Sequence, residues 1–342
     1  MVKASIVIPA FNAQKTIADC LNGLQKQSIP LNEFEVLVVD DGSTDRTAEI
    51  VLLYPFAQLS RQKNAGPAVA RNRGAKKAAA DIVVFLDSDC VPRKNWLSEM
   101  LKPFKDPRVT GVQGKYENPS PEWMTRFVQF EIEERYERMK KSMQKNGSID
   151  FVGSYSAAYR KKVFLENNGF DEGFRAASGE DPDLSFRLAR KGHRLVFAED
   201  AIVAHFHPAS LVKYWRTKFY RAYWRVRLYQ RNPEKVKNDS YTNPIIKIQM
   251  AFAAFAIAFL ILGLVQHLFG TYSLFGFLFN FPSFFLSLCT LGILFLASIP
   301  TAFFIFKKDW IIGIMAIFIF TVNAFVFVIG YAYGVLKLGA KK

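Results

Sequence analysis

The feature that most constrains this chain is a stretch of 59 residues, Ile248 to Phe306, that contains no Asp, Glu, Lys or Arg. A second uncharged stretch of 27 residues runs from Trp310 to Leu336. Runs of about 18 or more apolar residues are typical of membrane-spanning helices. A fully water-soluble protein is therefore excluded. We predict a transmembrane region over 245–342, with about three helices over 248–269, 282–306 and 310–336.

Two details of this region stay open. The segment 270–281 is apolar but short and contains glycine, which fits a re-entrant segment. Splitting 267–306 into two shorter helices would give four spans instead of three, with about 20 residues in each. Three spans put the C-terminal lysines on the side opposite the catalytic domain, which goes against the positive-inside rule. Four spans put these lysines on the cytoplasmic side, together with the catalytic domain. We prefer three.

The positive charge lies mostly before the membrane region. The chain has a net charge of +15, and the part from Ile245 onward holds six Lys and one Asp, which leaves +10 for the first 244 residues. The three cysteines are scattered, so neither a disulfide framework nor a structural zinc site is predicted. The first apolar run ends at Pro9 and is too short for the core of a signal peptide. We therefore expect the first 244 residues in the cytoplasm.

The first 90 residues alternate between strand-like and helix-like patterns. Strands are predicted over 5–8, 35–39 and 82–86, and helices over 13–27, 44–53 and 65–79. Near-continuous apolar runs such as 82–86 are typical of strands buried on both faces. The alternation predicts an α/β domain with an open, mostly parallel sheet, whose ligands bind at the carboxyl ends of the strands.

Two of these strands lead directly into acidic residues. The run Asp40 to Asp45 follows one strand, and it fits either a turn with a helix cap or a ligand-binding loop. Asp87 and Asp89 follow another. Two carboxylates this close repel each other unless a cation lies between them. Oxygen ligands of this kind suit a divalent ion that also contacts phosphates.

A basic segment lies between these two acidic runs. Residues 63–74 contain a Gly-Pro turn that opens a helix with two arginines in its early turns. A helix N-terminus with cationic side chains suits an anion, although an ordinary helix with a solvated basic face is the alternative. The candidate anion-binding residues are Lys63, Asn64, Gly66 and Arg71.

Further acids and two histidines follow. Asp181 precedes Pro182, which fits a helix cap, but four acids between Glu172 and Asp183 exceed what one cap needs. A carboxylate at the edge of a cleft can act as a general base. His205 and His207 follow a strand predicted over 201–204, and we expect them to face opposite ways. At most one of them is then expected to reach the site as a metal ligand.

At this point the ordered motifs match a known family. They are VIPAFN from Val7, DDGSTD from Asp40, N-x-G and A-R-N-x-G between Asn64 and Gly74, DSD from Asp87, GFDE from Gly169 and GEDPDLSFRL from Gly179. With these motifs the chain resembles a family 2 glycosyltransferase with the GT-A fold. The resemblance covers roughly Lys3 to Pro208 and assigns 1–208 to a nucleotide-sugar glycosyltransferase domain.

The resemblance also implies an activity and roles for individual residues. It implies a hexosyltransferase-type enzyme that takes a sugar from a nucleotide-diphosphate sugar and inverts the anomeric centre. By motif, Pro9, Phe11, Asn12 and Asp41 would contact the nucleoside, and Asp87 and Asp89 would hold Mg²⁺ or Mn²⁺ on the diphosphate. Asp181, with Glu180 in the Glu-Asp motif, would be catalytic.

Two departures from family patterns narrow the type. The Gln-x-x-Arg-Trp pentapeptide of processive synthases is absent from the sequence, which favours transfer of one sugar per event. Enzymes that glycosylate polyprenyl phosphate typically lack the Glu-Asp motif, because an ionised phosphate needs no base. The motif therefore favours a hydroxyl acceptor, for instance on a lipid-linked saccharide. A polyprenyl-phosphate glycosyltransferase is the alternative.

The linker over 209–244 mixes basic and aromatic residues. Between His205 and Lys237 there are nine Lys or Arg and one acid, Glu234. Such a mixture could bind RNA by charge and stacking, but its place before the first span favours a helix at an anionic membrane surface. We therefore expect membrane lipids and no nucleic acid among the partners, and a multi-pass protein of the cell membrane with a cytoplasmic catalytic domain.

Two further classes of function are weaker. A scaffold with an inactive α/β domain predicts the loss of a DSD or GED carboxylate, and both motifs are intact. A transporter usually has charged residues within its spans, and the predicted spans have none.

Overall fold

The computed structural model describes residues 2–174, 178–236, 242–269 and 274–339. The chain forms two compact units. Unit 1 comprises residues 1–207 with 228–233, and unit 2 comprises residues 208–227 with 234–342. The two units are described separately below.

Unit 1 is built on one 8-stranded sheet in the order β3-β2-β1-β4-β7-β6-β8-β5. Strands β3, β2, β1 and β4 are parallel to one another, whereas β7 is antiparallel to β4 and to β6. Strands β6 and β8 are parallel, and β5 is antiparallel to β8. The strands are β1 (Ala4–Ala10), β2 (Phe34–Asp40), β3 (Ala57–Arg61), β4 (Ile82–Leu86), β5 (Cys90–Pro92), β6 (Val109–Glu117), β7 (Ser156–Arg160) and β8 (Arg194–His205).

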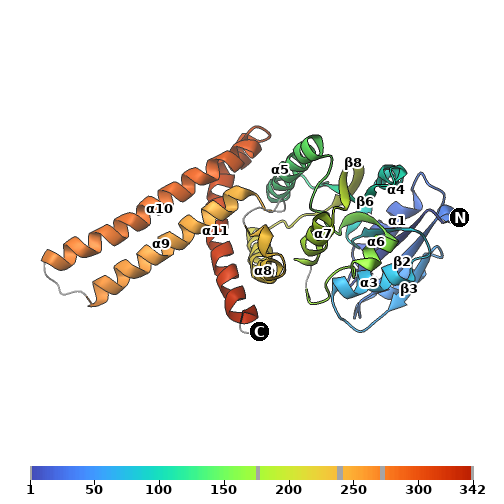
Figure 1. The fold of residues 1–342 in the computed structure, drawn as a ribbon, viewed down its shortest axis with the longest axis horizontal. Coiled ribbons are helices and arrows are strands. Elements are labelled where there is room, and N and C mark those ends of the chain that lie inside the picture. The colour runs from blue at the N-terminus through green and yellow to red at the C-terminus, as the bar shows by residue number, and fades with distance from the viewer. Residues whose placement is uncertain (1, 175–177, 237–241, 270–273, 340–342) are drawn as a thin grey trace. The chain divides into compact units, whose positions relative to one another are not determined.

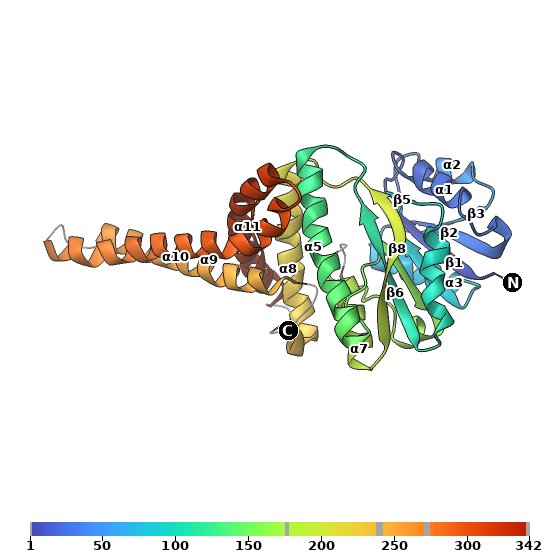
Figure 2. The same cartoon turned by 90° about the horizontal axis from the view of Figure 1, so that it is seen from above.

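Helices cover both faces of this sheet (Figure 1). Figure 2 shows the longest of them, α5, alongside β6 and β8. The helices of unit 1 are α1 (Ile17–Gln25), α2 (Thr47–Leu52), α3 (Pro67–Lys77), α4 (Trp96–Leu101), α5 (Trp123–Asn146), α6 (Lys161–Glu166) and α7 (Glu180–Arg190). Short 3-10 turns lie at η1 (Leu31–Glu33), η2 (Lys102–Lys105) and η3 (Pro233–Lys235).

The alternation of side chains along β4 explains how one strand serves two cores. Val84 and Leu86 belong to the apolar cluster that contains Trp96 of α4 and residues of α1. Phe85 points to the other face, where its ring lies 5.2 Å from those of Phe164 and Phe170. On that face α3 lies so close to β1 that a Cβ at Gly74 would overlap the Val7 side chain. The glycine of the A-R-N-x-G motif is therefore required by packing.

The expected strands and helices of the first 90 residues are present, with shifted ends. The predicted helix over 13–27 is α1, which begins at Ile17, and the predicted strand over 82–86 is β4. The strand predicted over 201–204 is the C-terminal part of the longer β8. The alternative of a helix cap at Asp181 does not hold, because Gly179 is the N-cap of α7.

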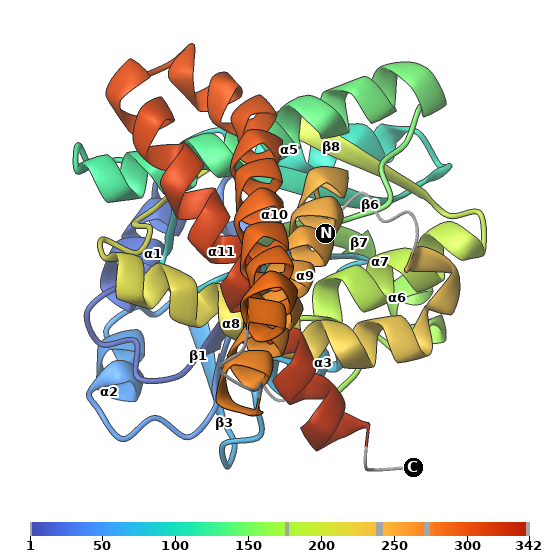
Figure 3. The same cartoon turned by 90° about the vertical axis from the view of Figure 1, so that its left-hand side faces the viewer.

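Unit 2 consists of helices. They are α8 (Leu211–Arg231), which contributes residues up to Arg227, α9 (Pro244–Phe269), α10 (Leu274–Phe306) and α11 (Trp310–Leu338). Helices α9 and α10 run side by side (Figure 1), and a view along them shows α11 next to them (Figure 3). Polar side chains link the helices: the Gln249 amide donates to Ser298 Oγ at 3.0 Å. Such hydrogen bonds are typical between membrane helices.

Helix α8 packs closely against α11 at two glycines. A Cβ at Gly330 would lie 2.5 Å from the Phe219 carbonyl oxygen, and one at Gly334 would lie 2.7 Å from the Tyr223 carbonyl oxygen. The spacing of four residues places both glycines on one face of α11, as in close membrane-helix contacts. The basic aromatic segment thus packs against the last apolar helix within unit 2.

Among the described residues, three helices are long and apolar enough to cross a membrane, over Pro244–Leu268, Pro282–Phe306 and Trp310–Leu338. They match the three predicted spans within a few residues. Of the predicted re-entrant segment, residues 270–273 lie outside the described residues, and the remainder belongs to α10.

Candidate active site

The parallel half of the sheet brings the predicted site residues to one edge. Ala10 of β1 pairs with Asp40 of β2, and β4 lies on the other side of β1. The segments that follow these three strands therefore meet at the carboxyl edge, where ligands of open α/β sheets bind. They begin at Phe11, Asp41 and Asp87.

On the β1 side, one side chain is available to stack on a flat ligand. Phe11 is 51% exposed although it follows a buried strand, and Pro9 precedes it. Asn12 has a positive φ of 49° and accepts hydrogen bonds from the Thr44 amide at 2.9 Å and the Thr44 hydroxyl. Asn12 therefore ties the β1 end to the DDGSTD loop, and the exposed Phe11 ring suits a nucleobase.

Asp41 was predicted to contact the nucleoside, but its carboxylate is bonded within the protein. One oxygen accepts from the Gln62 amide at 2.7 Å and from the Ala65 backbone at 2.9 Å, and the other accepts from the Gly66 backbone at 2.8 Å. Asp41 is also buried. In the structure Asp41 shapes the loop that carries the exposed Lys63 and Asn64, and its direct contact with the nucleoside stays a prediction.

Arg71 was predicted to bind an anionic ligand, yet it is only 2% exposed. One terminal nitrogen donates to Asp87 Oδ1 at 2.6 Å and the other donates to Glu180 Oε1 at 3.2 Å. In the structure Arg71 binds two carboxylates of the protein, and its contact with an anionic ligand stays a prediction. Its guanidinium joins the DSD motif at the end of β4 to the Glu-Asp motif at the start of α7.

Glu180 was predicted to be catalytic, but it is 1% exposed and has three donors. Besides Arg71, the Ser178 and Gly179 backbone amides donate to its second oxygen at 2.9 and 3.0 Å. In the structure Glu180 positions the first turn of α7, and its catalytic role stays a prediction.

Asp181, the next residue, has a different environment. Its Oδ1 is buried and has no hydrogen-bond partner within the described part of the chain. Burial, together with the negative charge of Glu180, raises the pKa of Asp181 to about 7, and the opposing effects of Arg71 and Ser154 are smaller. A carboxylate with a pKa near the working pH is well suited to general base catalysis.

The DSD turn presents one carboxylate to solvent. The Asp87 amide donates to the Tyr155 carbonyl, and the Cys90 amide donates to the Asp87 carbonyl, which closes a turn. Asp89, within this turn, is 52% exposed and its Oδ2 lies 3.3 Å from His205 Nε2. Partial burial acts to raise the pKa of Asp89, but the hydrogen bond and charge of His205 outweigh it and lower the pKa.

These residues fit a divalent ion only in part. No group of three or more His, Cys, Asp and Glu within the described residues could hold a metal without other ligands. Asp89 and His205 form a pair of suitable donors, whereas Asp87 Oδ1 is already bonded to Arg71. An ion at this place would need phosphate oxygens or water for its remaining ligands, as Mg²⁺ sites with nucleotides typically do.

The expectation that His205 and His207 face opposite ways was wrong. Their Nδ1 atoms lie 3.0 Å apart and their ring centroids 5.0 Å apart. Side chains two residues apart along an extended chain lie on the same face, because the strand repeats every two residues. His205 is next to Asp89, whereas His207 lies behind it, with its Nε2 2.9 Å from Gln129 Oε1.

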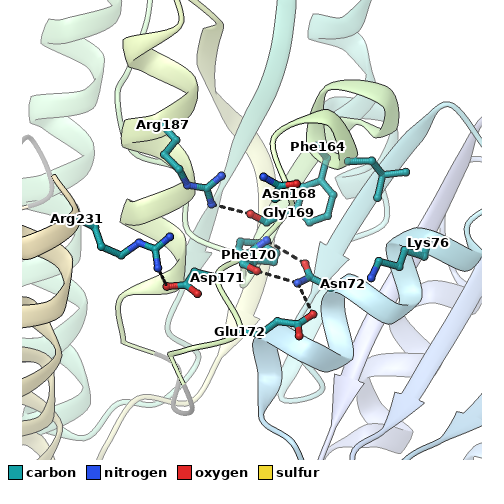
Figure 4. A pocket seen from close by; sticks show the side chains of 11 residues that line it. Asn72, Lys76, Phe164, Asn168, Gly169, Phe170, Asp171, Glu172, Arg187 and Arg231 are labelled. Carbon is teal, nitrogen blue, oxygen red and sulfur yellow. Dashed lines mark hydrogen bonds and ion pairs between the residues drawn. The ribbon is translucent and has the colours of Figure 1, made fainter. Parts of the chain in front are cut away.

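A cavity of about 380 Å³ lies beside this site. Its walls include Asn72 and Lys76 of α3, the GFDE segment and Arg187, and Figure 4 shows them around the opening. The Asn72 amide donates to the Phe170 carbonyl and to Glu172, and its oxygen accepts from the Phe170 amide. Through these bonds Asn72 joins the A-R-N-x-G and GFDE motifs. None of the predicted site residues lines the cavity.

Comparison with known proteins agrees with this geometry. The family profile described as glycosyl transferase family 2 matches residues 5–167. Glycosyltransferase AglE of Haloferax volcanii is 31% identical over 211 residues, which are 59% of this chain and 66% of that protein. Residues 5–167 therefore form a glycosyl transferase family 2 domain.

A second relative extends the comparison to 240 residues. Pre-mycofactocin glycosyltransferase of Mycobacterium tuberculosis is 30% identical over this length, which is 68% of this chain and 48% of that protein. The matches thus span 66% and 48% of the length of these two relatives.

Among solved structures, a mannosyltransferase from Pyrobaculum calidifontis, PcManGT, in complex with GDP-Man and Mn²⁺, has a TM-score of 0.62. It is 19% identical, and the match covers 99% of this chain and 88% of that chain. At this identity the match shows the shared GT-A fold. The predicted fold class is confirmed, and the predicted family is confirmed over residues 5–167.

Sequence reasoning missed three residues that shape the site. Asn72 lies inside a recognised motif, so its place there was a usable signal. Gln129 and Tyr116 lie between the motifs, and neither stands in a pattern that marks it in the sequence.

Proposed function

We propose that this protein is a membrane-bound inverting glycosyltransferase that transfers one sugar from a nucleotide-diphosphate sugar to a hydroxyl acceptor, for instance on a lipid-linked saccharide. The observation that carries the proposal is the bridge made by Arg71. Its guanidinium forms ion pairs with Asp87 of the DSD motif and with Glu180 of the Glu-Asp motif, and it thereby holds the two motifs next to each other. The neighbours of these two residues, Asp89 and Asp181, are the exposed and the titratable carboxylates of the site.

This arrangement supplies two chemical functions that a single displacement needs. Asp181 can accept the proton of an acceptor hydroxyl as its oxygen attacks the anomeric carbon. The diphosphate of the donor must lie near Asp89 and His205 on the other side, because the acceptor approaches opposite the leaving group. No covalent intermediate is needed, and each transfer then inverts the anomeric centre.

Asp89 and His205 would hold the divalent ion together with the diphosphate, and a bound cation stabilises the negative charge that develops on such a leaving group. Carboxylate oxygens suit both Mg²⁺ and Mn²⁺, whereas an imidazole nitrogen is a better ligand for a transition metal. The ligand pair therefore favours Mn²⁺. The solved protein of similar fold was determined with GDP-Man and Mn²⁺.

In this proposal the nucleoside stacks on Phe11, whose exposed ring offers a flat apolar surface. Asn12, the next residue, is fixed to the DDGSTD loop by its bond from Thr44. Of the predicted substrate ligands, the exposed Lys63 and Asn64 remain available on the loop that ends at Gly66.

The membrane assignment rests on length and composition. Within the described residues, three helices are long and apolar enough to span a bilayer, and the basic residues that precede α9 favour a cytoplasmic position for unit 1 by the positive-inside rule. Membrane anchoring in turn favours an acceptor that is itself held in the membrane.

The deciding experiment incubates membranes of an expressing strain with a panel of radiolabelled nucleotide sugars, followed by lipid extraction. The proposal expects label from one sugar to move into an extractable, metal-dependent product, and NMR of that product to show an inverted anomeric centre. Retention of the anomeric configuration would contradict the single displacement, and the absence of label from the lipid fraction would contradict the lipid-linked acceptor.

A further inference from the structure

Three polar side chains form a row behind the carboxylate that faces solvent in the DSD turn. His205 lies next to Asp89, His207 lies next to His205, and Gln129 of α5 lies next to His207. His207 and Gln129 are buried, whereas Asp89 at the other end of the row is 52% exposed. The contact of His207 with His205 connects the two buried side chains to the exposed end of the row.

The orientation of the Gln129 amide gives the row a direction. Its nitrogen donates to the Tyr116 carbonyl at 3.3 Å and to Glu133 Oε1 at 3.0 Å. The amide oxygen is therefore the atom that faces His207 Nε2 at 2.9 Å. An amide oxygen can only accept a hydrogen bond, so the proton lies on His207 Nε2.

The proton on His207 Nε2 in turn determines the proton positions on the other ring nitrogens of the row. In a neutral imidazole one nitrogen carries the proton and the other accepts. His207 Nδ1 is therefore the acceptor of the 3.0 Å contact, and His205 Nδ1 is its donor. His205 Nε2 is left with its lone pair directed at Asp89 Oδ2, 3.3 Å away. Two lone pairs that face each other are unfavourable unless a cation lies between them: a proton when His205 is charged and donates to Asp89, or a metal ion when His205 is neutral.

We propose that Gln129 and His207 are positioning residues that fix the tautomer and the ring orientation of His205, so that its Nε2 serves as a metal ligand beside Asp89. The proposal rests on the metal-assisted function proposed above. Ligating histidines commonly donate their other ring nitrogen to a second group, which orients the ring and makes the ligating nitrogen more basic. Here that second group is another histidine, itself oriented by an amide.

Aromatic packing keeps the two imidazoles in place. The Tyr116 ring lies 4.7 Å from that of His205 and 5.6 Å from that of His207. Tyr116 is stacked on Tyr155 at 3.6 Å, and the Tyr136 hydroxyl accepts a hydrogen bond from the Tyr116 amide at 2.7 Å. The rings are thus held on one side by a buried aromatic group and on the other by hydrogen bonds.

The tautomer can be observed directly in the full-length protein. The chain has four histidines, so selective ¹⁵N-histidine labelling and long-range ¹H–¹⁵N correlation can resolve each ring. We expect the Nδ1–H form for His205 and the Nε2–H form for His207. Gln129→Leu should convert His207 to a mixture of tautomers, and His193→Ala, away from the row, should leave both spectra unchanged.

Metal affinity is the second readout, measured by Mn²⁺ EPR titration in the presence of inorganic pyrophosphate. His205→Ala should abolish tight binding. His207→Leu and Gln129→Leu should weaken Mn²⁺ binding by about 10- to 100-fold, the usual effect of losing a partner of a metal ligand. His207→Gln can accept from His205 and donate to Gln129, so it should restore most of the affinity.

The outcomes separate the two proposals. If wild-type protein binds no Mn²⁺ in the presence of pyrophosphate, the metal-assisted function is wrong. The positioning role of Gln129 and His207 is then wrong as well, because it depends on a bound metal. If wild type and His205→Ala differ as expected but His207→Leu binds Mn²⁺ as tightly as wild type, the positioning role is overturned while the metal-assisted function stands. An Nε2–H tautomer of His205 in the wild type would also overturn it.

Discussion

Replacing Asp181 by Asn should make the protein slower and, at neutral pH, more stable. The structure places this carboxylate where ionisation is unfavourable, with a pKa raised from 3.8 to about 7 by burial and by Glu180. One pKa unit corresponds to about 1.4 kcal/mol, so an ionised Asp181 lowers the free energy of unfolding by up to about 4 kcal/mol. Asn has nearly the same size and carries no charge, so it removes this cost.

The stability effect depends on pH in a defined direction. Because the folded-state pKa of Asp181 lies above its unfolded value, the native state binds the extra proton between these two values, and wild-type stability falls as pH rises through them. The advantage of Asp181→Asn over wild type should be about 4 kcal/mol at pH 8 and about 2 kcal/mol at pH 5. Thermal unfolding of the full chain in detergent at both pH values measures this. Asp200→Asn, at an exposed position, is the matched control and should show neither effect.

The rate effect goes the other way. Loss of a general base typically lowers the rate by about 10²- to 10⁴-fold. In wild type, a base with a pKa near 7 should make the rate fall about tenfold per pH unit below pH 6, and this slope should vanish in the variant. Release of nucleoside diphosphate in the presence of acceptor is the assay. An Asp181→Asn protein that binds donor normally and transfers at a near wild-type rate would refute the hydroxyl acceptor and favour polyprenyl phosphate. A variant less stable than wild type at pH 8 would refute the electrostatic reasoning.

Three further predictions concern the other parts of the molecule. Arg71→Met leaves two carboxylates without their buried cation, so thermal unfolding should show that the free energy of unfolding falls by about 3–5 kcal/mol. The decline of the transfer rate in acid should also move to higher pH, and an unchanged decline would contradict this. Asp89→Asn, like excess chelator on wild type, should abolish transfer, and Mn²⁺ should restore the chelated enzyme better than Mg²⁺; full activity in chelator would remove the metal from the mechanism. Gly334→Leu should separate α8 from α11 and destabilise the protein by about 1–3 kcal/mol, whereas Gly292→Leu, where a Cβ would meet nothing within 4 Å, is the control and should have little effect.

The sheet and the position of the site could be predicted because both depend on local patterns. Buried strands such as 82–86 read as continuous apolar runs, and acids directly after them must lie at the carboxyl edge of a parallel sheet. The position of Asp87 and Asp89 follows from these two facts alone. The three apolar helices were equally accessible, because a membrane span depends on length and composition.

The division of labour among the charged residues was not accessible in this way. Arg71 and Glu180 are separated by 109 residues in sequence, and their mutual burial depends on how α7 packs near the end of β4. A sequence shows the charge of a residue and its motif, but not whether its donors and acceptors are already bonded. Arg71, Asp41 and Glu180 were therefore given to the substrate, although each is bonded within the protein. The prediction that His205 and His207 face opposite ways was wrong for a simpler reason. Side chains two residues apart along a strand lie on the same face.

The assignment of Asp181 as the reactive member of the Glu-Asp motif follows from counting hydrogen-bond donors. One buried cation, Arg71, lies among three carboxylates, so the protein must stabilise the remaining negative charge with other groups. Glu180 receives two backbone amides besides Arg71, and Asp87 receives a short bond from Arg71. Asp181 keeps a buried oxygen without a donor in the described residues. The unbalanced charge therefore falls on the carboxylate that can still take a proton. Glu180 and Asp181 have the same charge and adjacent positions, so their different bonding gives the first a positioning role and leaves the second free to act as the base.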